Sequence, residues 1–233
     1  MYFVNWQREI SVEERNGQKV VVKRNKPTKG FHEFLLIFAY SLISILLAHP
    51  SPPPLLSKIM RNEGREMRKN LERMGISTPE LISISDNGLV EEYIEGGNLY
   101  KALLSGKSTR LAVGAGRMTG RMHKAGYAFI DNKAQNYLVR GDDVIRTDLG
   151  FIQKSTSSYA RGMDIGSFLA SVMDLDRYRE VEKAFFDGYM SEFGHKFPCI
   201  SIVIRNILSV GFSSDNRTTL KNMALDGTPL IGI

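Results

Sequence analysis

Two periods of apolar residues divide the chain. In the first 95 residues apolar and polar positions alternate over short runs, which is typical of strands, whereas later apolar residues recur every three or four positions, which is typical of helices. Residues 9–24 hold two strand-like runs on either side of Asn16-Gly17, a pair suited to the positive φ angles of a tight hairpin turn. Two more strands are predicted at 81–84 and 89–94. The first part of the chain is therefore predicted to be rich in β-structure.

Helices account for most of the remaining sequence. A charged segment over 58–73 keeps its apolar residues on one stripe at helical spacing, and Gly75 is suited to end that helix. A short hairpin with strands at 137–139 and 144–146 lies among the later helices, and the tail from about residue 209 yields no predicted element. The later helices are predicted at 98–105, 109–125, 162–174 and 176–193.

This distribution of elements indicates the fold class. Strands in the first part and helices in the second favour an α+β fold with two lobes over an alternating parallel sheet. We expect a small β-rich N-lobe over residues 1–95 and a reduced helical C-lobe over residues 96–233. A chain of 233 residues is long enough for two small lobes that share a cleft.

One strongly apolar segment has no place in this scheme. Residues 34–48 read FLLIFAYSLISILLA and carry no charge, but they are fewer than the roughly twenty apolar residues that a spanning helix needs. The prolines at 50–54 prevent the helix from continuing. A buried or interface helix is the simpler interpretation, and membrane contact or docking to a protein partner is the alternative.

Composition and charge are those of an ordinary globular protein. The hydrophobic fraction is 42% and the charged fraction 24%. The formal net charge of +6 permits attraction to nucleotides or RNA, but the basic residues are spread along the chain, so a nucleic-acid partner is only weakly supported. Cys199 is the single cysteine, which excludes an intrachain disulfide and favours a reducing, cytoplasmic location.

The residues best suited to chemistry lie between positions 131 and 150. Asp131 is followed five residues later by Asn136, and after a short hairpin come Asp148 and Gly150. A hairpin returns the chain to its starting point and so brings the two acids together. Phosphoryl transfer needs one carboxylate to orient the attacking hydroxyl, and a second carboxylate and an amide oxygen to hold a hard cation such as Mg²⁺ or Mn²⁺. The segment therefore predicts a phosphotransfer site.

This order and spacing resembles the catalytic and metal-binding loops of the protein-kinase-like superfamily. The short loop from Gly150 to Asp164 is most similar to small atypical branches, namely the kinase of the KEOPS tRNA-modification complex, the RIO kinases and the lipopolysaccharide-core sugar kinases. The resemblance implies that Asp131 is the catalytic base and that Lys133 contacts the transferred phosphate. It also implies that Asn136 and Asp148 bind Mg²⁺ or Mn²⁺.

The resemblance extends into the N-lobe. Lys23 ends the run Val-Val-Val-Lys and looks like the lysine that grips the α- and β-phosphates of ATP, with Glu63, in preference to Glu66, as its ion-pair partner. The segment LVEEYIEGGNL looks like the hinge, which implies that backbone groups near Glu92 and Ile94 hold adenine.

Three features depart from the family pattern. Residues 1–14 contain no glycine, so the glycine-rich phosphate loop is not recognisable. Phe129-Ile130 stands where the superfamily has the histidine that braces the metal loop, and Glu91 stands where an apolar gatekeeper is usual. These departures leave open whether the chain is an active enzyme or a pseudokinase.

The sequence therefore predicts an ATP-dependent, Mg²⁺- or Mn²⁺-dependent phosphotransferase. A serine/threonine protein kinase of atypical type, with a protein substrate, is the leading hypothesis, through Lys133 and the resemblance. One alternative is a small-molecule kinase for a sugar or lipid headgroup that docks to a membrane through residues 34–48. The other is a pseudokinase or ATPase-like scaffold in an RNA-modification complex.

Overall fold

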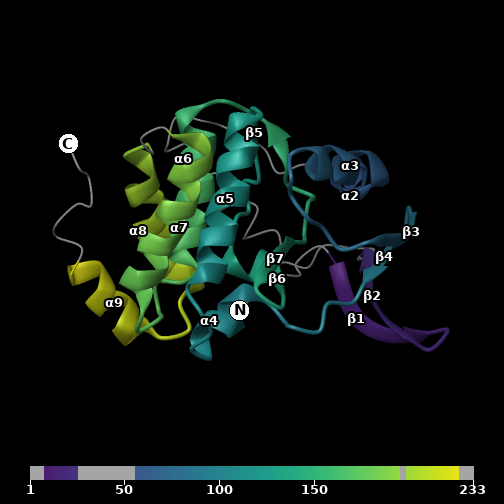
Figure 1. Cartoon of the computed structure of the whole chain (residues 1–233), viewed down its shortest axis with the longest axis horizontal. Coiled ribbons are helices and arrows are strands. Elements are labelled where there is room, and N and C mark those ends of the chain that lie inside the picture. Colours follow the sequence, from purple (N-terminus) through teal and green to yellow (C-terminus); the bar gives the residue numbers. More distant parts are fainter. Residues whose placement is uncertain (1–7, 26–55, 195–197, 226–233) are drawn as a thin grey trace.

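The computed structural model describes residues 8–25, 56–194 and 198–225. A twisted sheet with two helices forms one side of the molecule and a bundle of helices the other (Figure 1). The predicted α+β fold, with a small β-rich N-lobe and a reduced helical C-lobe, is confirmed. The exact division between residues 95 and 96 stays a prediction, and the apolar run at 34–48 lies outside the described residues.

The N-lobe is built on an antiparallel sheet of four strands in the order β1-β2-β4-β3. The predicted hairpin is confirmed, because Asn16 (φ 51°) and Gly17 (φ 75°) both adopt the left-handed conformation of the turn. Alternation along β2 turns Val20 and Val22 to one face, and Val21 and Lys23 to the other. The strands are β1 (Arg8–Arg15), β2 (Gln18–Asn25), β3 (Leu81–Ser85) and β4 (Gly88–Glu92).

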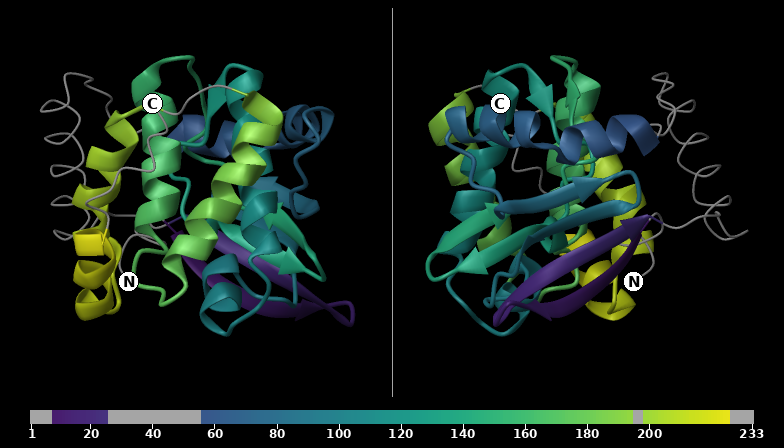
Figure 2. Two further views of the ribbon diagram at one scale, coloured as in Figure 1. Left: turned by 60° about the vertical axis from the view of Figure 1, so that its left-hand side comes forward. Right: turned by 90° about the vertical axis from the view of Figure 1, so that its right-hand side faces the viewer.

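Two consecutive helices lie along one face of this sheet (Figure 2). They are α2 (Leu56–Glu63) and α3 (Arg65–Arg73), where the sequence predicted one helix over 58–73. Gly64 separates them with an extended backbone (φ −73°, ψ 173°). Glycine is a weak helix former, so the interruption costs little at this position. The break leaves Glu63 as the last residue of α2, facing the protein interior.

The C-lobe has a core of apolar side chains shared by helices α5, α6 and α7. The four later helices predicted from sequence are confirmed with shifted ends, whereas α8 and α9 were not predicted. Among the described residues, no helix is long and apolar enough to cross a membrane. The helices are α4 (Leu99–Leu104), α5 (Arg110–Lys124), α6 (Ser158–Ala170), α7 (Tyr178–Phe193), α8 (Ile200–Phe212) and α9 (Asn216–Leu225).

Helices α5 and α7 approach each other closely through glycines. A Cβ atom on Gly116 would lie 2.0 Å from the carbonyl oxygen of Phe185, and one on Gly188 would lie 2.1 Å from that of Val113. Each glycine thus contacts the backbone of the opposite helix. The close contact sets α5 against α7, and α5 leads directly into the segment that contains Asp131.

Two small antiparallel ladders hold the segment between α5 and α6. The predicted hairpin is confirmed as β6 and β7, with Gly141 (φ 61°) in its turn. A second pairing joins β5 to β8, so the chain passes twice through the same region. The elements are β5 (Tyr127–Ala128), the 3₁₀ turn η1 (Ala134–Asn136), β6 (Tyr137–Arg140), β7 (Asp143–Arg146) and β8 (Gln153–Lys154).

Candidate active site

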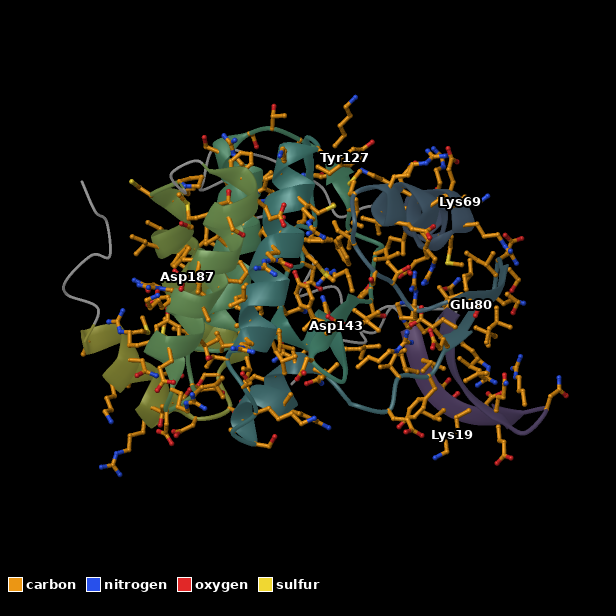
Figure 3. The ribbon with its side chains drawn as sticks, in the orientation of Figure 1. Lys19, Lys69, Glu80, Tyr127, Asp143 and Asp187 are labelled. Carbon is orange, nitrogen blue, oxygen red and sulfur yellow. The ribbon has the colours of Figure 1, made fainter. Side chains whose placement is uncertain are left out.

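A cavity of about 450 Å³ is lined by residues of both lobes. Apolar side chains of β1 and β2 contribute to it from the N-lobe, and the loops around η1 and after β7 contribute from the C-lobe. In Figure 3 Asp143, on the β6–β7 hairpin, lies between the lobes, whereas Asp187 on α7 lies on the side away from the sheet. The predicted site residues that line the cavity are Lys23, Ile94, Asp131, Asn136 and Asp148.

Asp131 and Asn136 meet as their spacing predicted. The Asn136 Nδ2 group donates to the carbonyl oxygen of Asp131 at 2.8 Å and to its Oδ2 at 3.1 Å. Lys133 Nζ lies 3.0 Å from Asp131 Oδ1, and the Asp131 side chain remains 22% exposed. The 3₁₀ turn η1 brings these side chains together within six residues. Asp131 is thus held on both oxygens and still reaches the cavity.

The turn before Asp131 is fixed from α6. Asp164 is fully buried and accepts hydrogen bonds from the backbone N–H groups of Phe129 (2.8 Å) and Ile130 (2.6 Å). Its Oδ2 also lies 3.0 Å from His123 Nε2. Ile130 has a φ of 66°, which is strained for a β-branched residue and persists because the carboxylate holds both amides. Asp164 therefore determines the direction in which the chain enters the segment 131–136.

A buried network of polar side chains around Asn132 supports the segment 131–136. Asn132 Nδ2 donates to Thr119 Oγ1 at 3.0 Å and to the carbonyl oxygen of Asp164 at 3.1 Å. Tyr137 donates its hydroxyl to Asn132 Oδ1 at 2.6 Å. Burial raises the pKa of Tyr137 to about 12, so the hydroxyl keeps its proton. Sequence reasoning missed Asn132, and its only signal was an amide one residue beyond Asp131, the predicted catalytic base.

Asp148 lies in the loop that follows β7, and its backbone has a left-handed conformation with a φ of 57°. Two backbone N–H groups anchor this loop. Thr147 N–H donates to the Asn136 carbonyl oxygen at 3.0 Å, and Leu149 N–H donates to the side-chain Oε1 of Glu63 at 3.2 Å. The loop after β7 is therefore tied both to the catalytic segment and to α2.

The residues present fit a divalent cation. The Asn136 NH₂ group is directed at Asp131, which leaves the Asn136 Oδ1 atom as an acceptor. Asp131 and Asp148 line the same cavity. Two carboxylates and an amide oxygen are the hard ligands that Mg²⁺ and Mn²⁺ prefer.

The partner of Lys23 differs from the predicted one. Lys23 Nζ lies 2.7 Å from Glu91 Oε1 and donates to Thr147 Oγ1 at 2.9 Å. Glu63, the predicted partner, instead pairs with Arg8 at 2.8 Å. The register explains the exchange, because Lys23 lies opposite Leu89 in the β2–β4 ladder, which puts Glu91 diagonally across on the same face. Lys23 therefore pairs with Glu91, the acid at the position where the superfamily usually has an apolar gatekeeper.

Five charged side chains form a buried cluster on the N-lobe side of the cavity, which we call the N-lobe ion cluster, and three of them line the cavity. Arg68 pairs with both acids of the cluster, since its NH2 group lies 2.8 Å from Glu91 Oε2 and 3.4 Å from Glu63 Oε2. All the members are at most 8% exposed. The members are Arg8, Lys23, Glu63, Arg68 and Glu91.

Opposite charges keep the Lys23–Glu91 pair ionised. Burial alone would lower the pKa of Lys23, but the carboxylates of Glu91, Glu63 and Asp148 together raise it. Burial alone would raise the pKa of Glu91, but Lys23 and Arg68 together lower it. Both members of the Lys23–Glu91 pair therefore carry their charges at neutral pH.

The two predicted hinge residues lie differently. Ile94 is buried and lines the cavity. Glu92 ends β4, where its backbone N–H donates to the carbonyl oxygen of Glu80 at 2.9 Å and its side chain pairs with Arg140. Just beyond, the Gly97 carbonyl oxygen accepts from Val139 N–H at 2.9 Å, which joins the segment after β4 to β6. The adenine-binding roles of Glu92 and Ile94 stay predictions.

Comparison with known proteins gives distant relatives. No protein-family model matches the chain. It is 27% identical over 140 residues, 60% of its length and 26% of the relative, to a probable bifunctional tRNA threonylcarbamoyladenosine biosynthesis protein of Methanocorpusculum labreanum. A protein of the same name from Methanospirillum hungatei is 27% identical over 136 residues, 58% of this chain and 25% of the relative.

A third relative is named for a kinase alone. The chain is 24% identical over 123 residues, 52% of its length and 61% of the relative, to a probable serine/threonine-protein kinase BUD32 homolog of Archaeoglobus fulgidus. The chain thus spans about a quarter of the two bifunctional relatives and about three fifths of this one. The resemblance to an atypical branch of the protein-kinase-like superfamily is confirmed at low identity.

Proposed function

We propose that this chain is an atypical phosphotransferase that uses ATP and Mg²⁺ or Mn²⁺ and transfers phosphate to a serine or threonine hydroxyl of a protein. One observation carries the proposal: Asp131, Asn136 and Asp148 line a single cavity together with Lys23. The name of the Archaeoglobus fulgidus relative supports the choice of acceptor. A cavity of about 450 Å³ falls within the size range of small-ligand pockets.

In this proposal each group of the site has a role. Asp131 orients the acceptor hydroxyl and takes its proton as the hydroxyl oxygen bonds to the γ-phosphorus, while the bond from that phosphorus to its bridging oxygen breaks and ADP leaves. Lys133, whose Nζ lies 3.0 Å from Asp131 Oδ1, would neutralise charge on the transferred group. Asn136 Oδ1 and Asp148 would hold the cation, which neutralises phosphate charge when bound. Lys23 positions the α- and β-phosphates.

A second candidate is an ATPase-like scaffold in a tRNA-modification complex. The names of two relatives concern tRNA threonylcarbamoyladenosine biosynthesis, and this observation favours it. In that function water would replace the alcohol as the acceptor at Asp131, and phosphate would be released. The proteins that bind the chain would then be partners in the complex, and not substrates that it phosphorylates.

Transfer from γ-labelled ATP tests both candidates. Wild type, Asp131→Ala and Asp148→Ala are incubated with Mg²⁺ or Mn²⁺, and label is measured on protein and as free phosphate. Asp187→Ala is the control, since Asp187 is an exposed acid on α7. We expect metal-dependent release of label that both active-site variants lose and the control keeps. Label on protein favours the kinase, free phosphate favours the ATPase, and full activity in Asp148→Ala would refute both.

A further inference from the structure

Arg146 lies at the end of β7, two residues before Asp148, and its side chain is fully buried. Its guanidinium donates to the carbonyl oxygens of three residues. The NH2 group reaches Asp131 at 2.8 Å and Asp148 at 3.4 Å, and the NH1 group reaches Asn136 at 3.4 Å. The Arg146 side chain thus contacts the backbone of Asp131, Asn136 and Asp148, the three C-lobe residues of the candidate site.

Two aromatic rings lie against this guanidinium. Its central carbon lies 4.4 Å from the ring centroid of Phe129 and 5.0 Å from that of Tyr137. A cation over an aromatic face is attracted by the ring, and more strongly where water is excluded. Phe129 precedes Asp131 and Tyr137 follows Asn136, so the rings belong to the same segment that the guanidinium holds.

Stability alone does not explain an arginine at this position. Its neighbours Val144 and Ile145 are buried apolar residues, and an apolar side chain would continue their pattern. Among the described residues, Arg146 Nε has no hydrogen-bond acceptor although it is buried. A buried charge and an unpaired N–H both cost free energy that an apolar residue would avoid. What an apolar residue cannot supply is a rigid fork of donors for several carbonyls.

We propose that Arg146 is a positioning residue that holds the catalytic segment and the metal loop in register. By fixing the three carbonyls it keeps the Asn136 amide oxygen and the Asp148 carboxylate together for one cation, with the Asp131 carboxylate held beside them for the acceptor hydroxyl. The inference deepens the proposed function and rests on it. It also explains how the two loops stay together although Phe129-Ile130 replaces the bracing histidine of the superfamily.

The test measures cation binding rather than turnover. Mn²⁺ is titrated by electron paramagnetic resonance into protein saturated with a non-hydrolysable ATP analogue, for wild type, Arg146→Met and Arg146→Lys. Arg205→Met is the matched control, since Arg205 is a buried arginine on α8 that contacts Tyr178 and Glu182. Melting temperatures are recorded for all four proteins to separate stability from binding.

We expect Arg146→Met to raise the half-saturating Mn²⁺ concentration about tenfold or more, the effect typical of losing a group that orients metal ligands. Arg146→Lys, which keeps the charge but not the fork, should fall between it and wild type. Arg205→Met should melt earlier and bind Mn²⁺ as wild type does.

Three results would overturn the inference. They are unchanged Mn²⁺ binding in folded Arg146 variants, an equal loss in Arg205→Met, and failure of both Arg146 variants to fold, which would make the arginine a structural group. Wild type separates this test from that of the proposed function. If it binds Mn²⁺ and nucleotide but neither transfers nor releases phosphate, the proposed function fails and the Arg146 test still holds. If it binds neither, both fail.

Discussion

The two halves of the candidate site are built in different ways. In the C-lobe, Asp131, Asn136 and Asp148 lie within 18 residues of one another and are fixed by hydrogen bonds to nearby backbone. In the N-lobe, the site depends on an ion cluster assembled from β1, β2, α2, α3 and β4. The first arrangement follows from spacing, and the second depends on which charges meet after folding. Local sequence therefore determines the C-lobe half of the candidate site far more directly than the half that contains Lys23.

The largest expected effect is on the C-lobe half. Replacing Asp164 with alanine leaves the Phe129 and Ile130 amides and His123 without their shared carboxylate. We expect a loss of about 3–5 kcal/mol in the free energy of unfolding. Urea denaturation measures it, with Asp187→Ala, an exposed acid, expected to change stability by less than about 0.5 kcal/mol. Similar values for the two variants would show that Asp164 does not fix the catalytic turn.

The N-lobe half can be tested by a double-mutant cycle. We expect Lys23→Met and Glu91→Gln to couple by about 1–3 kcal/mol, because their atoms lie 2.7 Å apart in a buried cluster. The matched cycle of Lys23→Met with Glu63→Gln should give a smaller coupling, since Glu63 pairs with Arg8 and Arg68. Unfolding curves of the single and double variants supply both values. The reverse order would restore the Lys23–Glu63 pair that the sequence predicted.

Thr147 joins the two halves, and a smaller effect is expected there. Its hydroxyl accepts from Lys23 Nζ and donates to Glu91 Oε1 at 3.1 Å. Thr147→Val keeps the shape and removes both bonds, at an expected cost of about 1–2 kcal/mol. Thr147→Ser keeps the hydroxyl and serves as the control for the lost methyl group. Thermal melts compare them, and equal losses in both variants would assign the effect to packing.

The smallest effect concerns pH. The pKa of Glu91 is below its ordinary value of 4.5 in the folded state, so its contribution to stability is complete above pH 4.5 and is lost as pH falls through the lowered pKa. Glu91→Gln removes this contribution, so stability should fall less steeply with acid than in wild type. Melting temperatures between about pH 3 and pH 7 measure the two slopes. Parallel slopes would show that Glu91 is not held ionised by Lys23 and Arg68.

The sequence was sufficient where neighbouring residues decide the outcome. Turn residues placed both hairpins, because Asn16-Gly17 and Gly141 adopt positive φ angles at no great cost. The order Asp131, Asn136, Asp148 placed the C-lobe half of the site, because one hairpin separates its parts. The sequence could not assign the partner of Lys23, since two acids compete for it and the sheet register decides between them.

Helix α8 escaped prediction for a different physical reason. Its buried face includes Ser201, Arg205 and Ser209, whereas Val203 and Val210 on the same helix are 46% and 72% exposed. Prediction from periodicity assumes that apolar residues face the core, and here the pattern is partly inverted. Arg146 was missed on the same grounds, because a charged residue ending a strand is expected to face solvent, and this one is fully buried.

The contact between α5 and α7 also limits which mutations could be repaired genetically. Alanine at Gly116 would meet the peptide oxygen of Phe185, an atom that no substitution on α7 removes. A second-site suppressor within the contact is therefore not expected, and revertants should restore glycine. Alanine at Gly114, two residues earlier on α5, would instead meet the Val144 side chain at 2.7 Å. That defect should be suppressed by Val144→Ala. Two nearby glycines of one helix therefore differ in whether a second substitution can compensate for their replacement.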